Sequence, residues 1–453
     1  MRITETFKMH PIDSQTLQEL QIFPKNPRDA SILNFFDRSA TEGGRDHLRQ
    51  LLTSPKRSHS DVIAFQDLLK AIMNEPDTFK INISRTYVAA AEAYYGSNIA
   101  YSMSQDVVRH WFDTLIFSLR NPAEFYMVQS GFFATFKVLK AIEKMTAALP
   151  ASLPDLLKDD AGFLNAFLNK KGLRNMLRRE EKKLSIRVIF YWDYFLRIVF
   201  KKELRSVLDI FYKFDAYQAI SQTAIVNRLS FPEFDERNAG RASFNARDIW
   251  HPLIKAAVPN SISLDDETPV CMLTGANTSG KTTFLKTCGI AVYLAHLGWP
   301  VPATGLRLTF CDRLFTSIHL SDDISLGYSH FYSEVMRIKT IAEALYAGEN
   351  CFIVIDELFR GTNQEDSLQC SIKVIGGFAR HKNSLFFVST HLEPLLQRFE
   401  HEGSICFRCF RTHIKGDNFI NSYQIENGIS SERLGQIILK KAGIELLLNG
   451  KKE

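Results

Sequence analysis

The sequence predicts an all-α part over residues 1–235, followed by an α/β part with a mostly parallel sheet over residues 236–453. Residues 40–230 contain few Gly or Pro residues, and their apolar positions recur at helical spacing. Beyond residue 250, short continuous apolar runs alternate with helical stretches, and the runs are too short to be helices. Such runs indicate parallel strands that helices cover on both faces.

The elements can be placed along the chain from these patterns. Pro122, Pro150 and Pro154 divide the first part into separate helices. The pattern changes near residues 235–250, where we expect the boundary between the two parts. In chain order, we expect helices at 44–52, 60–73 and 198–228 and strands at 270–273, 351–355 and 385–388.

Composition places the chain among ordinary globular proteins. Hydrophobic residues make up 45% and charged residues 23%, which excludes disorder as the main state. The net charge of +5 is too small to establish a nucleic-acid partner, so the distribution of charge must decide. The seven cysteines lie mostly in apolar stretches, which indicates a reduced, cytosolic protein.

The sequence contains no pattern typical of an export or membrane signal. Residues 1–11 are polar and lack an apolar region. The longest apolar run, residues 186–200, is interrupted by Arg187, Asp193 and Arg197, whereas a span needs about 20 apolar residues. Because Asp193 and Arg197 are four positions apart, they can form an ion pair on one helix. We therefore expect a buried or half-buried helix here, and a cytoplasmic protein.

Residues 275–282, GANTSGKT, fit the pattern G-x-x-x-x-G-K-[ST] between an apolar strand and a helical stretch. Gly275 and Gly280 would let backbone N–H groups approach phosphate oxygens, and the helix N-terminus adds a favourable partial charge. Lys281 would reach the β- and γ-phosphates of a nucleotide, and Thr282 would ligate Mg²⁺. A chance glycine-rich turn is the alternative interpretation. The expected site also includes Asn277, Ser279 and Thr283.

Two further strands end in residues that suit the same chemistry. Asp356 and Glu357 follow the apolar run 352–355, and an acid at a strand end lies beside the phosphate loop in such sheets. Asp356 can hold Mg²⁺, and Glu357 can polarise the attacking water. The third strand leads to His391, which could sense the γ-phosphate. A solvated acidic turn and a turn histidine are the alternatives.

Taken in order, the motifs of residues 250–445 resemble the ATPase domain of the MutS family of DNA mismatch-repair proteins. The run Asp-Glu-Leu-x-Arg-Gly-Thr at residues 356–362 is highly characteristic of that family. Residues 423–443 are similar to its C-terminal helical dimerisation segment, and residues 34–38 and 44–52 resemble the start of its helical core. The motifs lie at 251–252, 258–260, 275–282, 298, 301–303, 313–316, 321–323, 327–331, 334, 356–362 and 390–391.

The resemblance implies an ABC-like P-loop ATPase that uses ATP and Mg²⁺ and forms composite sites in a homodimer. Ser329 lies in the family's counterpart of the ABC signature and would contact the γ-phosphate held by the partner subunit. Tyr423 would flank the adenine ring.

Some positions depart from the family pattern. Ala276, Thr278 and Ser279 stand where the family usually carries Pro, Met and Gly, and Ala257 stands where an aromatic residue is common. Since none of the three loop side chains is needed for phosphate chemistry, we expect activity to be retained.

Full-length family members carry about two further domains before the helical core, a mismatch reader with a Phe-x-Glu wedge and a connector. The resemblance begins near residue 15 here, so we expect neither domain, and we expect the clamp of the core to be reduced or absent. Residues 234–236 spell Phe-Asp-Glu but lie at the end of the core, and we interpret them as coincidence.

Residues 170–205 hold the strongest basic cluster, with twelve Lys and Arg against four acids, a net charge of +8. Lys171, Arg174, Arg178 and Lys182 recur at helical spacing and would form one basic face. Such a face can neutralise DNA phosphates without reading bases. A solvated helix surface is the alternative.

Cys406 and Cys409 resemble half a zinc site, but no second pair follows at suitable spacing. Residues three apart on a strand face opposite sides, so we reject a metal role for this pair.

We therefore predict a dimeric, MutS-like, DNA-binding ATPase without mismatch recognition, which acts in DNA repair or recombination. It would use ATP to switch a helical clamp around duplex or branched DNA without sequence specificity. The alternative is an ATP-driven conformational module that acts on a protein partner and does not bind DNA.

Overall fold

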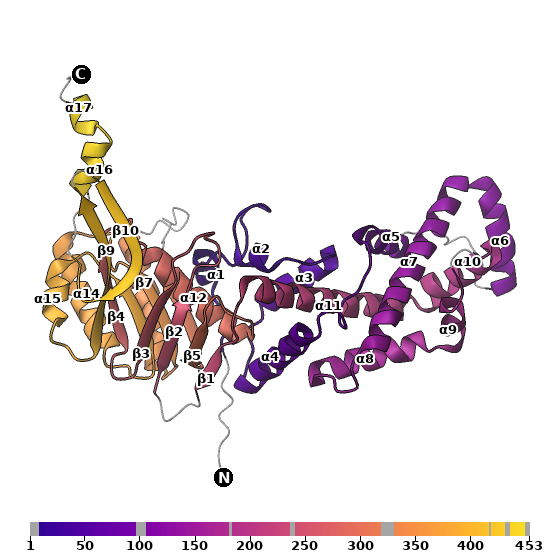
Figure 1. Ribbon diagram of the computed structural model, residues 1–453, viewed down its shortest axis with the longest axis horizontal. Helices are drawn as coiled ribbons and strands as arrows, with labels where there is room; N and C mark the ends of the chain where they lie inside the picture. Colours follow the sequence, from indigo (N-terminus) through magenta and orange to yellow (C-terminus); the bar gives the residue numbers. More distant parts are fainter. Residues whose placement is uncertain are drawn as a thin grey trace, which may run out of the picture. The chain divides into compact units, whose positions relative to one another are not determined.

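The computed structural model describes residues 9–96, 106–180, 184–235, 241–318, 330–415, 418–430 and 435–448. The chain folds into two compact units (Figure 1). We call the unit of Met1–Phe35, Leu52–Ile63 and Val226–Glu453 the α/β unit, and the unit of Phe36–Leu51 and Ala64–Ile225 the helical unit. The units thus interleave along the chain, in contrast to the single boundary near residues 235–250 that the sequence suggested.

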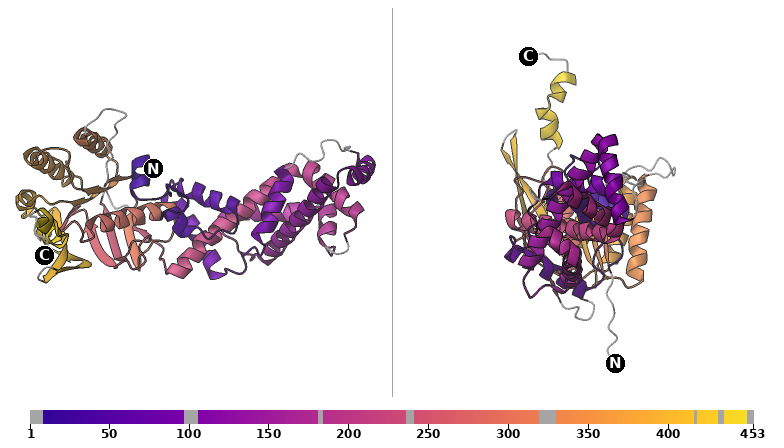
Figure 2. Two further views of the ribbon diagram at one scale, coloured as in Figure 1. Left: turned by 90° about the horizontal axis from the view of Figure 1, so that it is seen from above. Right: turned by 90° about the vertical axis from the view of Figure 1, so that its right-hand side faces the viewer.

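The helical unit is built around two helices of 27 residues each, α7 (Pro122–Ala148) and α11 (Lys201–Asn227). Its violet to magenta ribbons can be followed as one group of helices in Figure 2. None of the helices in the described residues combines the length and apolar character that crossing a bilayer requires. The other helices of this part of the chain are α3 (Glu42–Leu52), α4 (His59–Asn74), α5 (Arg85–Gly96), α6 (Val107–Arg120), α8 (Asp155–Leu168), α9 (Lys171–Leu177) and α10 (Ile186–Tyr194).

The apolar run at residues 186–200 is helical, as expected. It forms α10 and then a π-helical turn, Phe195–Val199. The expected ion pair is also confirmed, because Arg197 Nη2 lies 2.5 Å from Asp193 Oδ2 and Arg197 Nε donates to Asp193 Oδ1 at 2.6 Å. Both side chains are buried, and Tyr94 of α5 donates a further hydrogen bond to Asp193. The pair therefore joins two helices inside the unit.

The α/β unit contains a six-stranded sheet in the order β10-β9-β4-β8-β7-β6. Neighbouring strands are parallel from β9 through to β6, and β10 runs antiparallel to β9. The strands expected at residues 270–273, 351–355 and 385–388 are β4, β7 and β8, so a mostly parallel sheet is confirmed. The bounds are β4 (Val270–Gly275), β6 (Arg313–Ser317), β7 (Cys351–Asp356), β8 (Leu385–Ser389), β9 (Ile405–Lys415) and β10 (Asn418–Asn427).

A second, mixed sheet has the order β1-β5-β2-β3. Its strand β1 is parallel to β5, while β2 is antiparallel to both β5 and β3. Its strands are β1 (Glu233–Asp235), β5 (Gly305–Thr309), β2 (Ser243–Ile249) and β3 (Asn260–Asp265).

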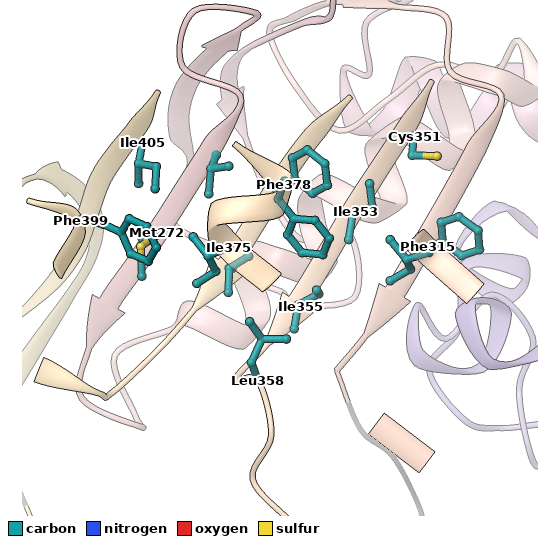
Figure 3. Packing of buried hydrophobic residues seen from close by; sticks show 14 of the residues in the cluster. Met272, Phe315, Cys351, Ile353, Ile355, Leu358, Ile375, Phe378, Phe399 and Ile405 are labelled. Atoms are coloured by element: carbon teal, nitrogen blue, oxygen red, sulfur yellow. The ribbon is translucent and has the colours of Figure 1, made fainter. Parts of the chain in front are cut away.

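Apolar side chains cover the large sheet on both faces. On one face, Ile353 and Ile355 of β7 lie in a buried cluster with Phe378 of α14, and Figure 3 shows this packing. Adjacent residues of a strand point to opposite faces, so Phe352 and Phe387 lie on the other face, where their rings contact Phe244 of β2. This double coverage explains the continuous apolar runs. The helices of the unit are α1 (Ser14–Glu19), α2 (Ile32–Phe36), α12 (Lys281–Leu297), α13 (His330–Tyr346), α14 (Gln364–Phe378), α15 (Glu393–Phe399), α16 (Gly435–Lys441) and α17 (Ile444–Leu448).

His296 of α12 is completely buried in the α/β unit. Its Nδ1 lies 2.8 Å from the carbonyl oxygen of Val292, and its Nε2 accepts the backbone N–H of Cys311 at 3.0 Å. A carbonyl oxygen only accepts and an N–H only donates, so the ring is a neutral imidazole with its proton on Nδ1. Burial lowers the pKa of His296 to about 4.

The lowered pKa of His296 predicts a loss of stability in acid. The unfolded chain takes up the proton near the ordinary histidine pKa, whereas the folded chain takes it up only near pH 4. The free energy of unfolding should therefore fall as the pH drops from about 6.5 to 4, by about 1.4 kcal/mol per pH unit for this group. Denaturant unfolding at several pH values in this range gives the slope of the unfolding free energy against pH. This slope should be shallower for His296→Gln than for the wild type, and His401→Gln, at an exposed position, is the matched control. An unchanged slope in His296→Gln would contradict the assignment.

Candidate active site

The carboxyl ends of β4, β7 and β8 meet at one edge of the large sheet. The loop of residues 275–280 follows β4 there, and α12 begins at Lys281, so the expected order of strand, loop and helix is confirmed. Gly275 and Gly280 have φ angles of 133° and 107°, which side chains rarely allow. A Cβ at position 275 would also lie 2.6 Å from the carbonyl oxygen of Phe410. Glycine is therefore required at the start of this loop.

Lys281 lies beneath the loop, with its side chain buried. Its Nζ donates to the carbonyl oxygens of Gly275 at 2.6 Å and Ala276 at 3.1 Å, and it lies 3.0 Å from Nε2 of His391. Burial lowers the pKa of Lys281 to about 8, although the carboxylates of Asp356 and Glu357 oppose this effect. The ammonium group is thus bound by two loop carbonyls and attracted by the charges of two acids.

Asp356 connects α12 to β8. Its Oδ2 accepts a hydrogen bond from Thr282 Oγ1 at 2.6 Å, and its Oδ1 accepts one from the hydroxyl group of Ser389. Within the described part of the chain, no group of three or more His, Cys, Asp or Glu side chains could hold a metal ion. A hydroxyl and a carboxylate still suit Mg²⁺, which commonly binds through one or two carboxylates together with phosphates and water. Thr282 and Asp356 are the residues that could hold it.

Glu357 contacts a basic side chain on each side. Its Oε2 lies 2.8 Å from Arg360 Nε, and its Oε1 lies 3.2 Å from His391 Nε2. Burial raises the pKa of Glu357, but the hydrogen bond from His391 and the charge of Arg360 outweigh burial and lower it overall. The same His391 nitrogen can accept from Lys281 or donate to Glu357, but not both at once.

A cavity of about 420 Å³ lies beside the loop, and Asn277, Thr282 and Thr283 are among the residues that line it. Tyr423 lines it from β10, where its backbone has a left-handed φ of 55°. Asn260 fixes this strand, because its Nδ2 donates to the carbonyl oxygen of Tyr423 at 3.0 Å and its Oδ1 accepts from the N–H of Ile425 at 2.7 Å. The C-terminal hairpin is therefore joined to the cavity.

The apolar wall of this cavity was not expected from the sequence. Trp250, Ile254 and Phe410 form part of it, together with Ala257. Trp250 and Ile254 lie between β2 and β3, before the glycine loop in the chain. The sequence contains one indication of this wall, namely several apolar side chains in the proline-containing loop between β2 and β3. Loops usually run over the protein surface, so apolar side chains in a loop suggest a binding surface.

His251 also lines the cavity and is buried. Burial, together with the charge of Lys286, lowers the pKa of His251 to about 4, so its ring is neutral at pH 7. Its Nδ1 accepts the N–H of Leu253 at 3.3 Å, which leaves the proton on Nε2. The ring can therefore donate one hydrogen bond.

The structure brings most of the expected site residues together. Ser279 differs, because its buried side chain donates to the carbonyl oxygen of Ala276 at 2.7 Å and so stabilises the loop itself. Ser329 lies outside the described residues. The residues that meet at the loop and cavity are Gly275, Asn277, Gly280, Lys281, Thr282, Thr283, Asp356, Glu357, His391 and Tyr423.

The basic residues that the sequence suggested for DNA contact belong to the helical unit. Lys171 and Arg174 are exposed on α9, and the exposed Arg178 follows the end of this helix. Lys182 lies outside the described residues. The helix has seven residues, and Leu173, Met176 and Leu177 bury its other face.

Among the described basic residues at 170–205, Arg197 and Lys170 form ion pairs with acids. Arg197 is buried against Asp193, and Lys170 Nζ lies 2.5 Å from Glu203 Oε1. Their charges are therefore offset within the unit.

Cys406 and Cys409 both lie in β9, so the strand expected around them is confirmed. Both are free thiols in the structure.

The loop geometry predicts opposite effects for two glycine substitutions. Gly275→Ala should lower the free energy of unfolding by about 2–4 kcal/mol, because the new methyl group meets backbone at an unfavourable φ. Gly376→Ala in α14 should instead raise it by up to about 1 kcal/mol, since the new methyl group makes only ordinary contact with Phe399 at 3.9 Å. Chemical denaturation of both variants measures the difference, and equal stabilities would contradict the geometry.

A parallel sheet with a glycine loop between β4 and α12, and with two acids at the end of β7, defines an α/β protein with its site at the carboxyl edge. Residues 271–447 match the family model of MutS domain V. Known relatives support this match. The DNA mismatch repair protein MutS of Syntrophomonas wolfei is 27% identical over 237 residues, which cover 51% of this chain and 27% of that protein.

Two further relatives have the same description. MutS of Ehrlichia ruminantium (strain Gardel) is 29% identical over 232 residues, covering 51% of this chain and 28% of that protein. The DNA mismatch repair protein MSH6 of Saccharomyces cerevisiae is 33% identical over 195 residues, covering 42% of this chain and 15% of that protein. Over the matched residues, the chain is thus similar to MutS proteins and to MSH6. It matches less than a third of the length of these relatives.

Proposed function

We propose that the chain is an Mg²⁺-dependent ATPase of the MutS family that acts on DNA in repair or recombination. One observation carries the proposal: Lys281, Thr282 and the acid pair at 356–357 meet at one sheet edge, beside a cavity of about 420 Å³. Ligand sites commonly have volumes of roughly 300–1,000 Å³. The proposed action on DNA is supported by the relatives of this chain that are named DNA mismatch repair proteins.

In this proposal, the loop and Lys281 bind the phosphates of ATP. Nζ of Lys281 would exchange its bonds to the carbonyl oxygens of Gly275 and Ala276 for bonds to phosphate oxygens. Phosphate charge would raise the pKa of Lys281 from about 8, so the bound state would hold the full ammonium charge. The helix N-terminus at α12 adds its partial positive charge.

The cavity accommodates the nucleoside. Its apolar wall of Trp250 and Ile254 suits the faces of a purine, Tyr423 would flank the ring, and neutral His251 can donate a hydrogen bond. Thr282 and Asp356 would hold Mg²⁺, which offsets the charge of the transferred phosphate.

Glu357 would act as the base. Its lowered pKa keeps it ionised at pH 7, and Arg360 holds one of its carboxylate oxygens. When Lys281 turns to phosphate, Nε2 of His391 would be free to donate to Glu357 or to the γ-phosphate. The two binding options of His391 would thereby link phosphate binding to the orientation of the base.

We further propose a composite site in a homodimer, in which Ser329 contacts the γ-phosphate bound by the partner subunit. For DNA, the exposed residues Lys171, Arg174 and Arg178 would contact phosphates from the helical unit. The chain matches less than a third of the length of these relatives. We therefore base these roles on residues of this chain and do not transfer them from the whole relatives.

The first test separates ATP binding from ATP hydrolysis. Lys281→Ala should abolish ATP binding, because phosphate loses its buried cation. Glu357→Gln should bind ATP with wild-type affinity but hydrolyse it about 100-fold more slowly, since Mg²⁺ and phosphate contacts survive while water activation does not. Calorimetry and phosphate release measure the two steps. Glu365→Gln, at an exposed position on α14, is the matched control, and wild-type turnover in Glu357→Gln would exclude it as the base.

The second test concerns DNA. Replacing Lys171, Arg174 and Arg178 together by Gln should weaken duplex binding and reduce the slope of log K against log salt by about 0.9 for each phosphate that is no longer neutralised. The control carries the same charge change at Lys70, Lys144 and Lys158, which are exposed elsewhere on the helical unit. Fluorescence anisotropy at several salt concentrations gives both slopes. Equal slopes for the two triple variants would refute the proposed contact.

One observation favours the alternative function, an ATP-driven module that acts on a protein partner. The helix α6 exposes apolar side chains at helical spacing, which suits docking of another protein. If DNA leaves ATP hydrolysis unchanged at every salt concentration, this alternative gains support. The exposed fractions are 68% for Val108, 53% for Phe112, 50% for Leu115, 49% for Ile116 and 79% for Leu119.

A further inference from the structure

The short helix α1 is bonded to both β6 and α13 through a buried arginine of α13. Nη2 of Arg337 donates to Asp13 Oδ2 at 3.2 Å and to Thr16 Oγ1 at 2.9 Å. The same guanidinium donates to the carbonyl oxygen of Thr316 from Nε at 2.9 Å and from Nη2 at 2.7 Å. The Arg337 side chain is only 8% exposed, so these bonds replace water almost entirely.

A second acid of α1 holds the end of β6. Oε2 of Glu19 accepts from Thr316 Oγ1 at 2.5 Å and from the N–H of Ile318 at 3.0 Å. Glu19 is buried as well. A buried, multiply bonded set of polar groups fixes one arrangement, because any misplacement leaves a group without a partner. The set therefore fixes α13 to α1 and β6.

Glu334 lies one turn before Arg337 on α13. It accepts hydrogen bonds from the segment that follows Asp356 and Glu357. Its Oε1 accepts the N–H of Arg360 at 3.3 Å, and its Oε2 accepts the N–H of Gly361 at 3.4 Å. The rings of Phe331 and Phe359 add a contact with centroids 5.8 Å apart. Glu334 is buried, so this attachment is protected from water.

The segment held by Glu334 is strained. Glu357 and Phe359 have left-handed φ angles of 61° and 59°, which persist only where surrounding structure enforces them. Arg360, whose backbone Glu334 binds, places its guanidinium 2.8 Å from Glu357 and 3.6 Å from Asp356. The position of α13 thus determines where Arg360 holds the Glu357 carboxylate.

From this continuous set of contacts we infer that Arg337 and Glu334 are positioning residues, which make the orientation of Glu357 depend on the placement of α1. The inference rests on the proposed ATPase function. Neither residue is among those that line the cavity in the described part of the chain, and the bonds of Glu334 at residues 360–361 lead to Glu357 through Arg360. Their loss should lower the rate of the chemical step and leave ATP binding unchanged.

The test compares kcat with KM in conservative variants. Glu334→Gln keeps the size of the side chain but offers one acceptor oxygen instead of two, so kcat should fall about tenfold while KM for ATP stays within twofold. Arg337→Lys should act in the same direction. The controls are Glu343→Gln on the same helix, at a side chain 67% exposed, and Arg398→Lys at an exposed position on α15.

A double variant tests the connection to α1. Thr16→Val removes one acceptor of Arg337, and its effect on kcat should not add to that of Glu334→Gln, because both act through α13. Thermal unfolding of each variant identifies loss of fold. Additive effects, a kcat for Glu334→Gln equal to that of Glu343→Gln, or a change confined to KM would each overturn the inference.

Amide hydrogen exchange gives a readout that does not depend on turnover. At least one of the N–H groups of Arg360 and Gly361 should exchange at least tenfold faster in Glu334→Gln than in Glu343→Gln, because one of them loses its acceptor. If the wild-type protein hydrolyses no ATP, the proposed function fails, whereas the exchange rates still report on the attachment. Unchanged exchange at both amides would overturn the inference by itself.

Discussion

The hydrogen bonds of Asp356 are the interaction on which the site depends. One carboxylate oxygen accepts from Thr282 at the start of α12, and the other accepts from Ser389 at the end of β8. A single buried acid is therefore bonded to one residue 74 positions before it and to another 33 positions after it in the sequence. Lys281, the residue before Thr282, is held beneath the glycine loop by the same arrangement. Because the strands are parallel, all of these groups reach the same edge of the sheet.

Strain at the site is balanced by rigid surroundings. Gly275 and Gly280 adopt φ angles that other residues avoid, and Glu357, Phe359 and Tyr423 adopt left-handed φ angles although they carry side chains. Such backbone conformations are costly and persist where packing over-determines them. The buried cluster beneath the sheet, which includes Phe359, and the bonds of Asn260 to β10 supply that restraint. Packing in the core thus stabilises the strained backbone that positions the residues of the site.

The α/β unit is completed by N-terminal residues. The helix α1 and its N-cap Asp13 contribute Asp13, Thr16 and Glu19 to a largely buried polar set with β6 and α13. Leu20, which follows α1, packs so closely on α12 that a Cβ at Gly289 would lie 2.8 Å from it. A segment that precedes the helical unit in the chain is therefore bonded to the sheet that carries the site. Because α1 shares these bonds with α13, a change in α1 alters the contacts of α13 directly.

The sequence by itself determined the local parts of this protein. The strand, loop and helix around residues 270–297, the acids that end β7 and the pair of Asp193 and Arg197 all follow from neighbours within a few positions, where steric and periodic rules act. The family match also follows from the order of such local motifs.

Only the tertiary structure decided the features that depend on distant partners. These features are the cavity wall formed by Trp250 and Ile254, the position of Tyr423 beside Gly280, and the contact of Arg337 with Asp13 at the start of α1. Each of them brings together segments that are far apart in the sequence. It also decided that the side chain of Ser279 turns inward to the carbonyl oxygen of Ala276. The physical reason is the same in each case. A side chain's partners are chosen by packing and burial in three dimensions, and local spacing does not encode them.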